Sequence, residues 1–88
     1  MAWKVEYTDI AERAMAKLDP QVRKRINGFF RKRVTKIDAP TTIADPLVGE
    51  FRGLWRFRIG DCRAICDISQ KRLLVLVLDV GHRREIYR

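Results

Sequence analysis

The sequence has few residues that bind metals or form cross-links: two cysteines and one histidine among 88 residues. Cys62 and Cys66 are four residues apart, which is about 13 Å along a strand and too far for a disulfide with each other. One histidine without a second cysteine pair disfavours a zinc site, and no cluster of Asp and Glu suits two metal ions. We therefore expect buried, reduced cysteines and neither a metal nor another cofactor.

Long hydrophobic runs and low-complexity segments are also absent. No apolar run approaches the ~18 residues that a membrane-spanning helix needs. Residues 1–6 alternate between apolar and polar side chains and lack the apolar core of a signal peptide. We expect a cytoplasmic protein without membrane contact, folded as one small domain over residues 1–88 with a modest core.

Positive charge is what the chain has in excess. Nineteen Lys and Arg residues against 11 Asp and Glu residues give a net charge of +8 and a pI near 10.2. Such an excess is typical of proteins that bind nucleic acid or anionic surfaces. Seven of these cations lie between positions 20 and 37 with no acid among them: Arg23, Lys24, Arg25, Arg31, Lys32, Arg33 and Lys36. We interpret this segment as a surface that follows phosphates without reading a base sequence.

Two helices are predicted in the first half of the chain. Thr8 or Asp9 is suited to cap the first helix, because apolar residues follow at helical spacing. Asp19 followed by Pro20 marks the start of the second helix, since proline fits the first helical position. The apolar stripe of this second helix continues as far as residue 37. The short connection between the two predicts a helical hairpin.

Strands are predicted before and after the helices. Residues 3–7 alternate as a strand does, and residues 38–53, with two prolines and two glycines, are expected to form a loop. A β-hairpin is expected over residues 55–66, and the continuous apolar run 73–78 is typical of a central strand covered on both faces. The order β-α-α-β-β-β predicts an α+β domain. In it, the helical hairpin packs on one face of a small, mostly antiparallel sheet, and the other face is left as a shallow groove.

The predicted β-hairpin is the most informative segment. Gly60-Asp61 separates two alternating runs, and glycine first in a two-residue loop suits a type II′ turn. With this turn, Arg58 faces Arg63 directly and Arg56 lies diagonal to Arg63, so that the three arginines share one face. The other face receives the alternate positions: Trp55, Phe57, Ile59, Cys62, Ala64 and Cys66.

Three converging arginines have two interpretations. Like charges directly opposite each other destabilise a sheet, so the cluster favours a functional site for an anion. The alternative is a solvated face balanced by neighbouring carboxylates, and Asp79, which interrupts the last apolar run, is a candidate partner for Arg63. In a domain this basic, we favour the anion site.

A family resemblance rests on three stretches in this order: Asp45-Pro46-Leu47 with Gly49, then residues 53–63, then residues 81–87. Together they resemble the RelE/ParE toxin superfamily of bacterial toxin–antitoxin systems, and within it the RelE branch. The resemblance covers essentially the whole chain, including the element order. It implies a metal-independent endoribonuclease that enters the ribosomal A site, cleaves mRNA there and inhibits translation. It also implies a protein antitoxin that wraps around the toxin.

The resemblance also implies site residues. Family members place basic residues at the positions of Arg56, Arg58 and Arg63, an arginine at Arg83 and a tyrosine at Tyr87. Three further residues are expected to contact RNA: Arg52, His82 and Arg84. Some RelE members have lysines at the first two positions, and here both are arginine. Because arginine does not titrate usefully, charge stabilisation suits it better than proton transfer.

The implied chemistry needs few groups, because RNA brings its own nucleophile in the 2′-hydroxyl. The protein has to deprotonate that hydroxyl, hold it in line and stabilise the phosphorane-like charge. Tyr87 is the candidate base, since nearby cations lower the pKa of a tyrosine from about 10. Arg56, Arg58 and Arg63 would bind the scissile phosphate, and Arg83 would act at the leaving 5′-oxygen.

Three alternatives stay open. A ParE-like toxin of the same fold would poison DNA gyrase without being a nuclease. A basic RNA-binding module without catalytic activity would account for the positive charge but would give Tyr87 no role. A related nuclease branch relies on Glu and His as base and acid, which Glu50 and His82 would supply. His82 has either a structural or a supporting role in the favoured reading.

Overall fold

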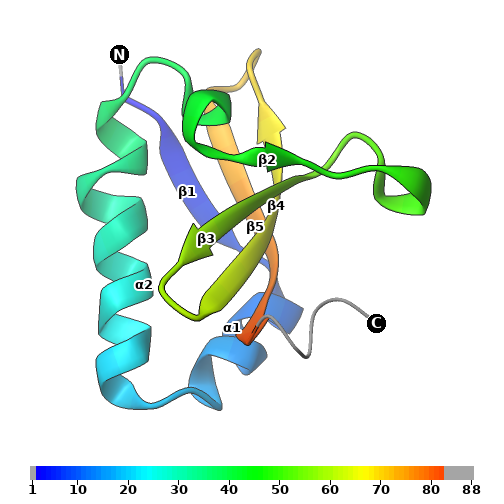
Figure 1. Ribbon diagram of the computed structural model, residues 1–88. Helices are drawn as coiled ribbons and strands as arrows, with labels where there is room; N and C mark the ends of the chain where they lie inside the picture. The colour runs from blue at the N-terminus through cyan, green and yellow to red at the C-terminus, as the bar shows by residue number, and fades with distance from the viewer. Residues whose placement is uncertain (1, 83–88) are drawn as a thin grey trace.

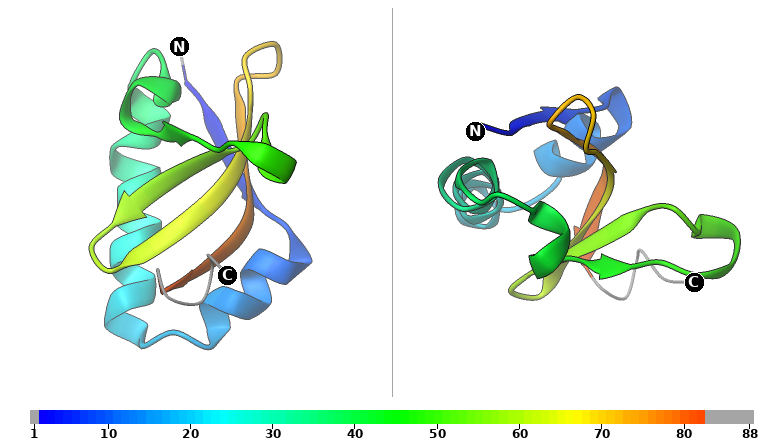
Figure 2. Two further views of the ribbon diagram at one scale, coloured as in Figure 1. Left: turned by 45° about the vertical axis from the view of Figure 1, so that its right-hand side comes forward. Right: turned by 90° about the horizontal axis from the view of Figure 1, so that it is seen from above.

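The computed structural model describes residues 2–82. These residues form a sheet of five strands in the order β1-β5-β4-β3-β2, in which β1 is parallel to β5 and all other pairs are antiparallel. The elements are β1 (Lys4–Tyr7), α1 (Asp9–Ala16), α2 (Pro20–Lys32), β2 (Asp45–Pro46), β3 (Trp55–Ile59), β4 (Cys62–Ser69) and β5 (Leu74–His82). Both helices lie on one side of the sheet (Figures 1 and 2), so the predicted α+β fold is confirmed, with β2 as an additional strand.

The first helix begins where the sequence predicted. The Thr8 hydroxyl accepts a hydrogen bond from the Ala11 amide at 3.1 Å, which satisfies one of the unpaired N–H groups of the first turn of α1. The same hydroxyl donates to the Leu78 carbonyl at 3.1 Å. The cap therefore fixes the start of α1 to the central strand β5.

The second helix begins at Pro20 as predicted but ends at Lys32, not near residue 37. The Thr35 hydroxyl donates to the Arg31 carbonyl at 2.6 Å, and a 3₁₀ turn over Val34–Lys36 replaces the last α-helical turn. Side chains of this type compete for backbone carbonyls and weaken a helix. The tighter turn still buries Val34 completely.

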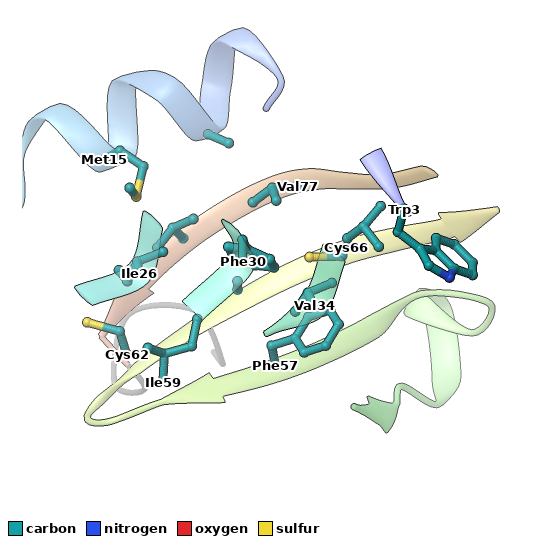
Figure 3. Packing of buried hydrophobic residues seen from close by; sticks show 14 residues of the cluster. Trp3, Met15, Ile26, Phe30, Val34, Phe57, Ile59, Cys62, Cys66 and Val77 are labelled. Carbon is teal, nitrogen blue, oxygen red and sulfur yellow. The ribbon is translucent and has the colours of Figure 1, made fainter. Parts of the chain in front are cut away.

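The core lies between the helices and the sheet, and Figure 3 shows side chains from both layers meeting there. Its centre is Phe30 of α2, which is 1% exposed. Phe30 makes edge-to-face contacts with Tyr7, Phe29 and Phe57, with ring centroids 5.4 to 6.1 Å apart. Phe57 belongs to β3, so this aromatic cluster fixes β3 on α2.

Two predictions about the strands were wrong. The segment 38–53, expected to be a loop, contains β2, which pairs with the first two residues of β3. The run 73–78 was expected to be covered on both faces. Val75 and Val77 are completely buried under the helices, whereas Leu74, Leu76 and Leu78 on this run are only half-buried.

A β-bulge in β5 decides which way its last residues face. Ile65 of β4 pairs with Asp79, and the next residue, Cys66, pairs with Val77, so that Leu78 is an extra residue in β5. The bulge shifts the alternation of the strand by one. Val77 and Val80 both face the core as a result, although they are three residues apart.

The expectation about the two cysteines is met. Cys62 and Cys66 are both buried thiols, and burial raises the pKa of Cys66 well above its ordinary value. No helix within residues 2–82 is long and apolar enough to cross a membrane.

Candidate functional site

The β3–β4 turn places the arginines as predicted. Arg58 pairs with Arg63 and Ile59 with Cys62 across the two-residue loop. Gly60 has a φ of 61°, and Asp61 does not have a positive φ, which fits a type II′ turn. The register therefore puts Arg56, Arg58 and Arg63 on the face of the sheet that the helices leave uncovered.

Asp45, which was not among the predicted site residues, completes this cluster. Its Oδ2 accepts hydrogen bonds from Arg56 Nη2 at 3.0 Å and Arg56 Nε at 3.3 Å. Arg58 Nε forms an ion pair with the same oxygen at 3.2 Å. The strand pair β2–β3 makes this possible, because it sets Asp45 directly opposite Arg56. Asp45-Pro46 did belong to the family resemblance, but only as a motif.

The electrostatics of Asp45 follow from these contacts. The hydrogen bonds from Arg56 lower the pKa of Asp45, and the charges of Arg58, Arg56 and Arg63 lower it further. The carboxylate is therefore ionised at neutral pH and offsets one of the three positive charges. The side chain of Arg58 is still 61% exposed, so it is accessible to a ligand from solvent.

A hollow of about 230 Å³ adjoins the cluster at the side of α2. Phe29, Arg33, Ile43, Asp45 and Arg58 line it. The Arg33 guanidinium lies 5.9 Å from the centre of the Phe29 ring, in cation–π contact. The hollow thus adds one guanidinium, from the residue that follows α2, to those of the sheet.

Other cations of α2 have contacts within the fold. Arg23 donates to the carbonyls of Met15 and Leu18, at 3.4 and 3.1 Å, and so holds the C-terminal end of α1. Arg23 therefore has a role within the fold, whereas the prediction that this segment forms a phosphate-binding surface stays a prediction. Arg25 lies against the β3–β4 turn, with Nη1 2.8 Å from where a Cβ on Gly60 would be.

The structure separates His82 from the arginines. His82 pairs with Cys62, whose side chain is in the core, and cross-strand partners share a face. His82 accordingly lines a hollow of about 460 Å³ on the helix side, together with Lys17 and Asp19. This position argues against RNA contact in common with the arginine cluster. The bulge at Leu78 is the reason, and the uniform apolar run gave no sign of it.

The remaining predicted residues are placed as follows. Arg52 is exposed and ends the 3₁₀ turn Gly49–Phe51, just before β3. That turn also carries Glu50, and β5, which carries His82, is separated from β2 by two strands. The structure therefore does not bring Glu50 and His82 together as a base and acid pair. The predicted Arg83, Arg84 and Tyr87 lie outside the described residues.

Two further expectations concern Asp79 and metals. Asp79 accepts a hydrogen bond from the Val80 amide at 2.8 Å, and no ion pair joins it to Arg63. The carboxylate of the cluster comes instead from Asp45, on the opposite side of the hairpin, which forms ion pairs with Arg56 and Arg58. Within residues 2–82, no group of three His, Cys, Asp or Glu side chains is arranged to hold a metal ion. The cluster as described is suited to electrostatic binding of an oxyanion.

The fold of two helices on one face of a five-stranded, mostly antiparallel sheet matches solved structures of RelE toxins. The profile of the family described as "ParE toxin of type II toxin-antitoxin system, parDE" matches residues 5–87. The chain belongs to this family, and thus to the RelE/ParE superfamily. It is a toxin of a type II toxin–antitoxin system.

Individual relatives point to the RelE branch. Toxin RelG of Mycobacterium tuberculosis is 30% identical over 88 residues, which are 100% of this chain and 99% of that protein. The toxin–antitoxin complex RelBE2 of the same species has a chain that is 26% identical, with a TM-score of 0.86 over 94% of this chain and 93% of that one. The isolated Escherichia coli RelE toxin, at 16% identity, shares the fold, with a TM-score of 0.69 over 92% of this chain and 84% of that one.

Proposed function

We propose that this toxin is a ribosome-dependent endoribonuclease that cleaves mRNA in the A site and so arrests translation in the cytoplasm. The observation that carries the proposal is the cluster of Arg56, Arg58 and Arg63 on the open face of the sheet. A phosphodiester is an anion that fits such a cluster, because guanidinium groups match phosphate oxygens in charge and geometry. The similarity to RelE toxins supports the same function.

The proposed reaction is an attack of the 2′-hydroxyl of RNA on the adjacent phosphorus. The P–O5′ bond breaks as the new P–O2′ bond forms, which leaves a 2′,3′-cyclic phosphate, and the 5′-oxygen takes up a proton from water. The arginine cluster stabilises the extra negative charge of the transition state. Tyr87 takes the proton from the 2′-hydroxyl, and Arg83 stabilises the leaving oxygen. Arg52 and Arg84 hold the neighbouring backbone.

A sparse site of this kind needs help to orient its substrate. None of the arginines is an efficient base, so the reaction depends on correct alignment of the 2′-hydroxyl with the phosphorus. The ribosome supplies that alignment by holding the codon in one conformation. We therefore expect cleavage of mRNA on ribosomes and little cleavage of naked RNA.

The partner that restrains the toxin is a cognate antitoxin. Two of the similar solved structures, RelBE2 of M. tuberculosis and RelBE of E. coli, are toxin–antitoxin complexes. The net charge of +8 favours an antitoxin segment with acidic residues, because opposite charge steers association. Co-expression of the antitoxin should restore growth to cells that express the toxin.

The test is single-turnover cleavage of mRNA on programmed ribosomes, with the new 5′ ends mapped by primer extension. Arg63→Ala should lower the rate by roughly 10²–10³, as the loss of one oxyanion donor does. Tyr87→Phe should keep ribosome binding and lose cleavage. Arg72→Ala is the matched control, since Arg72 is an exposed cation in the turn between β4 and β5. Rates near that of the unaltered protein for both Arg63→Ala and Tyr87→Phe would refute the assignment.

A second function has support in the family profile, which is described by its ParE members. A ParE-like toxin would bind DNA gyrase and leave mRNA intact. Gyrase supercoiling assays alongside primer extension separate the two functions: inhibited supercoiling with uncut mRNA selects the ParE-like function.

A further inference from the structure

We propose that Asp45 is a positioning residue. Its carboxylate binds the guanidinium groups of Arg56 and Arg58 and orients them, so that the Nη atoms of Arg58 face the substrate phosphate. This inference rests on the proposed function, because it names a further residue of the same site. Asp45 was predicted neither as a catalytic nor as an RNA-binding residue, and only the pairing of β2 with β3 brings it into the cluster.

The contact geometry is the first argument. One oxygen, Oδ2 of Asp45, lies within 3.3 Å of nitrogens from two arginines. Arg58 approaches it with Nε. A guanidinium is planar and has five N–H donors, so a contact at Nε leaves the Nη end of Arg58 for a second anion. Among residues 2–82, Asp45 is the acid with which Arg58 forms an ion pair.

The like charges of the cluster are the second argument. Arg58 and Arg63 are directly opposite each other, and Arg56 is adjacent on the same face. Without a counter-charge the three guanidinium groups repel one another and spread into solvent, because all three side chains are long and flexible. The Asp45 carboxylate lies between two of them and fixes both in one orientation.

The backbone of Asp45 argues against the opposite role, in which its carboxylate occupies the anion site until a phosphate displaces it. Asp45 is held in β2, opposite Arg56 and beside Pro46, which pairs with Trp55. If a phosphate displaced the Asp45 carboxylate from the arginines, the charge of that carboxylate would stay within a few ångströms of the phosphate and repel it. Binding of the phosphate to the free end of Arg58, with Asp45 in place, avoids this repulsion.

The experiment compares Asp45→Asn with Asp67→Asn. Both variants remove one negative charge and keep the size of the side chain, and Asp67 is an exposed residue of β4 four positions beyond Arg63. For Asp45→Asn we expect a maximal single-turnover rate on programmed ribosomes about 10- to 100-fold lower, because misaligned groups cost up to about 10² in rate. The half-saturating toxin concentration should be unchanged or lower, because the site becomes more positive. Asp67→Asn should keep the full rate.

A second measurement observes the contact without any cleavage. The ¹H–¹⁵N signals of the Arg56 and Arg58 Nε–H groups, assigned with Arg→Lys variants, should be resolved and slow to exchange in the unaltered protein. They should move to the solvent-exposed average in Asp45→Asn and stay in place in Asp67→Asn. Thermal unfolding of both variants checks that each is folded.

Every outcome decides between the roles. A slower rate at equal or tighter half-saturation, with the Nε signals lost, supports positioning. A rate for Asp45→Asn equal to or above that of the unaltered toxin overturns it, and so do unchanged Nε signals. If the unaltered toxin does not cleave at all, the proposed nuclease fails, and the Nε signals decide the contact by themselves.

Discussion

The direct pairing of Arg58 with Arg63 leads to a prediction in which stability and activity respond in opposite directions. Both charges lie on the uncovered face, opposite each other across β3 and β4, and Arg58 is 61% exposed. Two unit charges about 7 Å apart in water repel each other by about 0.6 kcal/mol. For a domain of this size, that energy is equivalent to about 2–5 °C in the unfolding temperature.

The perturbation is a double-mutant cycle with Arg58→Gln, Arg63→Gln and the combination. Urea unfolding at low salt should show that Arg63→Gln is more stabilising by about 0.6 kcal/mol when Arg58 is present than when it is absent. In 1 M salt the screening length is about 3 Å, so the coupling should disappear. The matched control is the cycle of Arg58 with Arg72, which lies in the turn after the far end of β4 and should show no coupling.

The same variants should lose cleavage. Both arginines act on the same phosphate, so the rate losses of Arg58→Gln and Arg63→Gln should be less than additive. An attractive coupling in urea unfolding, or a coupling that persists in 1 M salt, would refute the reasoning. Either result would mean that the coupling is not a salt-screened repulsion between two exposed charges.

Three further predictions concern the fold. Phe30→Ala should cost about 3–5 kcal/mol in urea unfolding, because Phe30 is 1% exposed, whereas Phe51→Ala, at a residue 52% exposed, should change stability by no more than about 0.5 kcal/mol. A loss for Phe30→Ala as small as that for Phe51→Ala would contradict the packing shown here. Gly60→Ala should destabilise by about 1–2 kcal/mol because its φ is 61°, whereas Gly28→Ala in α2, with open space around it, should stabilise by up to about 1 kcal/mol; equal effects would count against the turn. Burial raises the pKa of Tyr7 to about 12, so stability should fall as the pH rises from about 10 through 12; Tyr7→Phe should lack this alkaline loss in thermal unfolding, and an identical loss would rule out Tyr7 as its source.

The hairpin that carries the arginines could be predicted from the sequence because its determinants are local. Gly60 defines the turn, and strict alternation on both sides defines which residues share a face. The cap at Thr8 and the start of α2 at Pro20 are local signals of the same kind. Elements of this type need no knowledge of the rest of the fold.

Asp45 and the end of β5 could not be predicted, because their determinants are distant or hidden. β2 has two residues, one of them a proline, and exists only through its pairing with β3. Within the run that ends at Leu78, every residue is apolar, so no alternation marks the extra residue. The side on which His82 lies depends on that extra residue, which is why the sequence left its role open.

The bulge at Leu78 changes which positions of β5 face the core. Side chains alternate between the core face and the open face both before and after Leu78. The core-facing positions are odd-numbered before it (Val75, Val77) and even-numbered after it (Val80). If β5 kept Leu78 but paired without the bulge, regular alternation from Val77 would turn Val80 outward and Asp79 into the core. The one extra residue therefore allows β5 to contribute apolar side chains to the core on both sides of the bulge. It also determines which polar side chains of the strand are exposed to solvent.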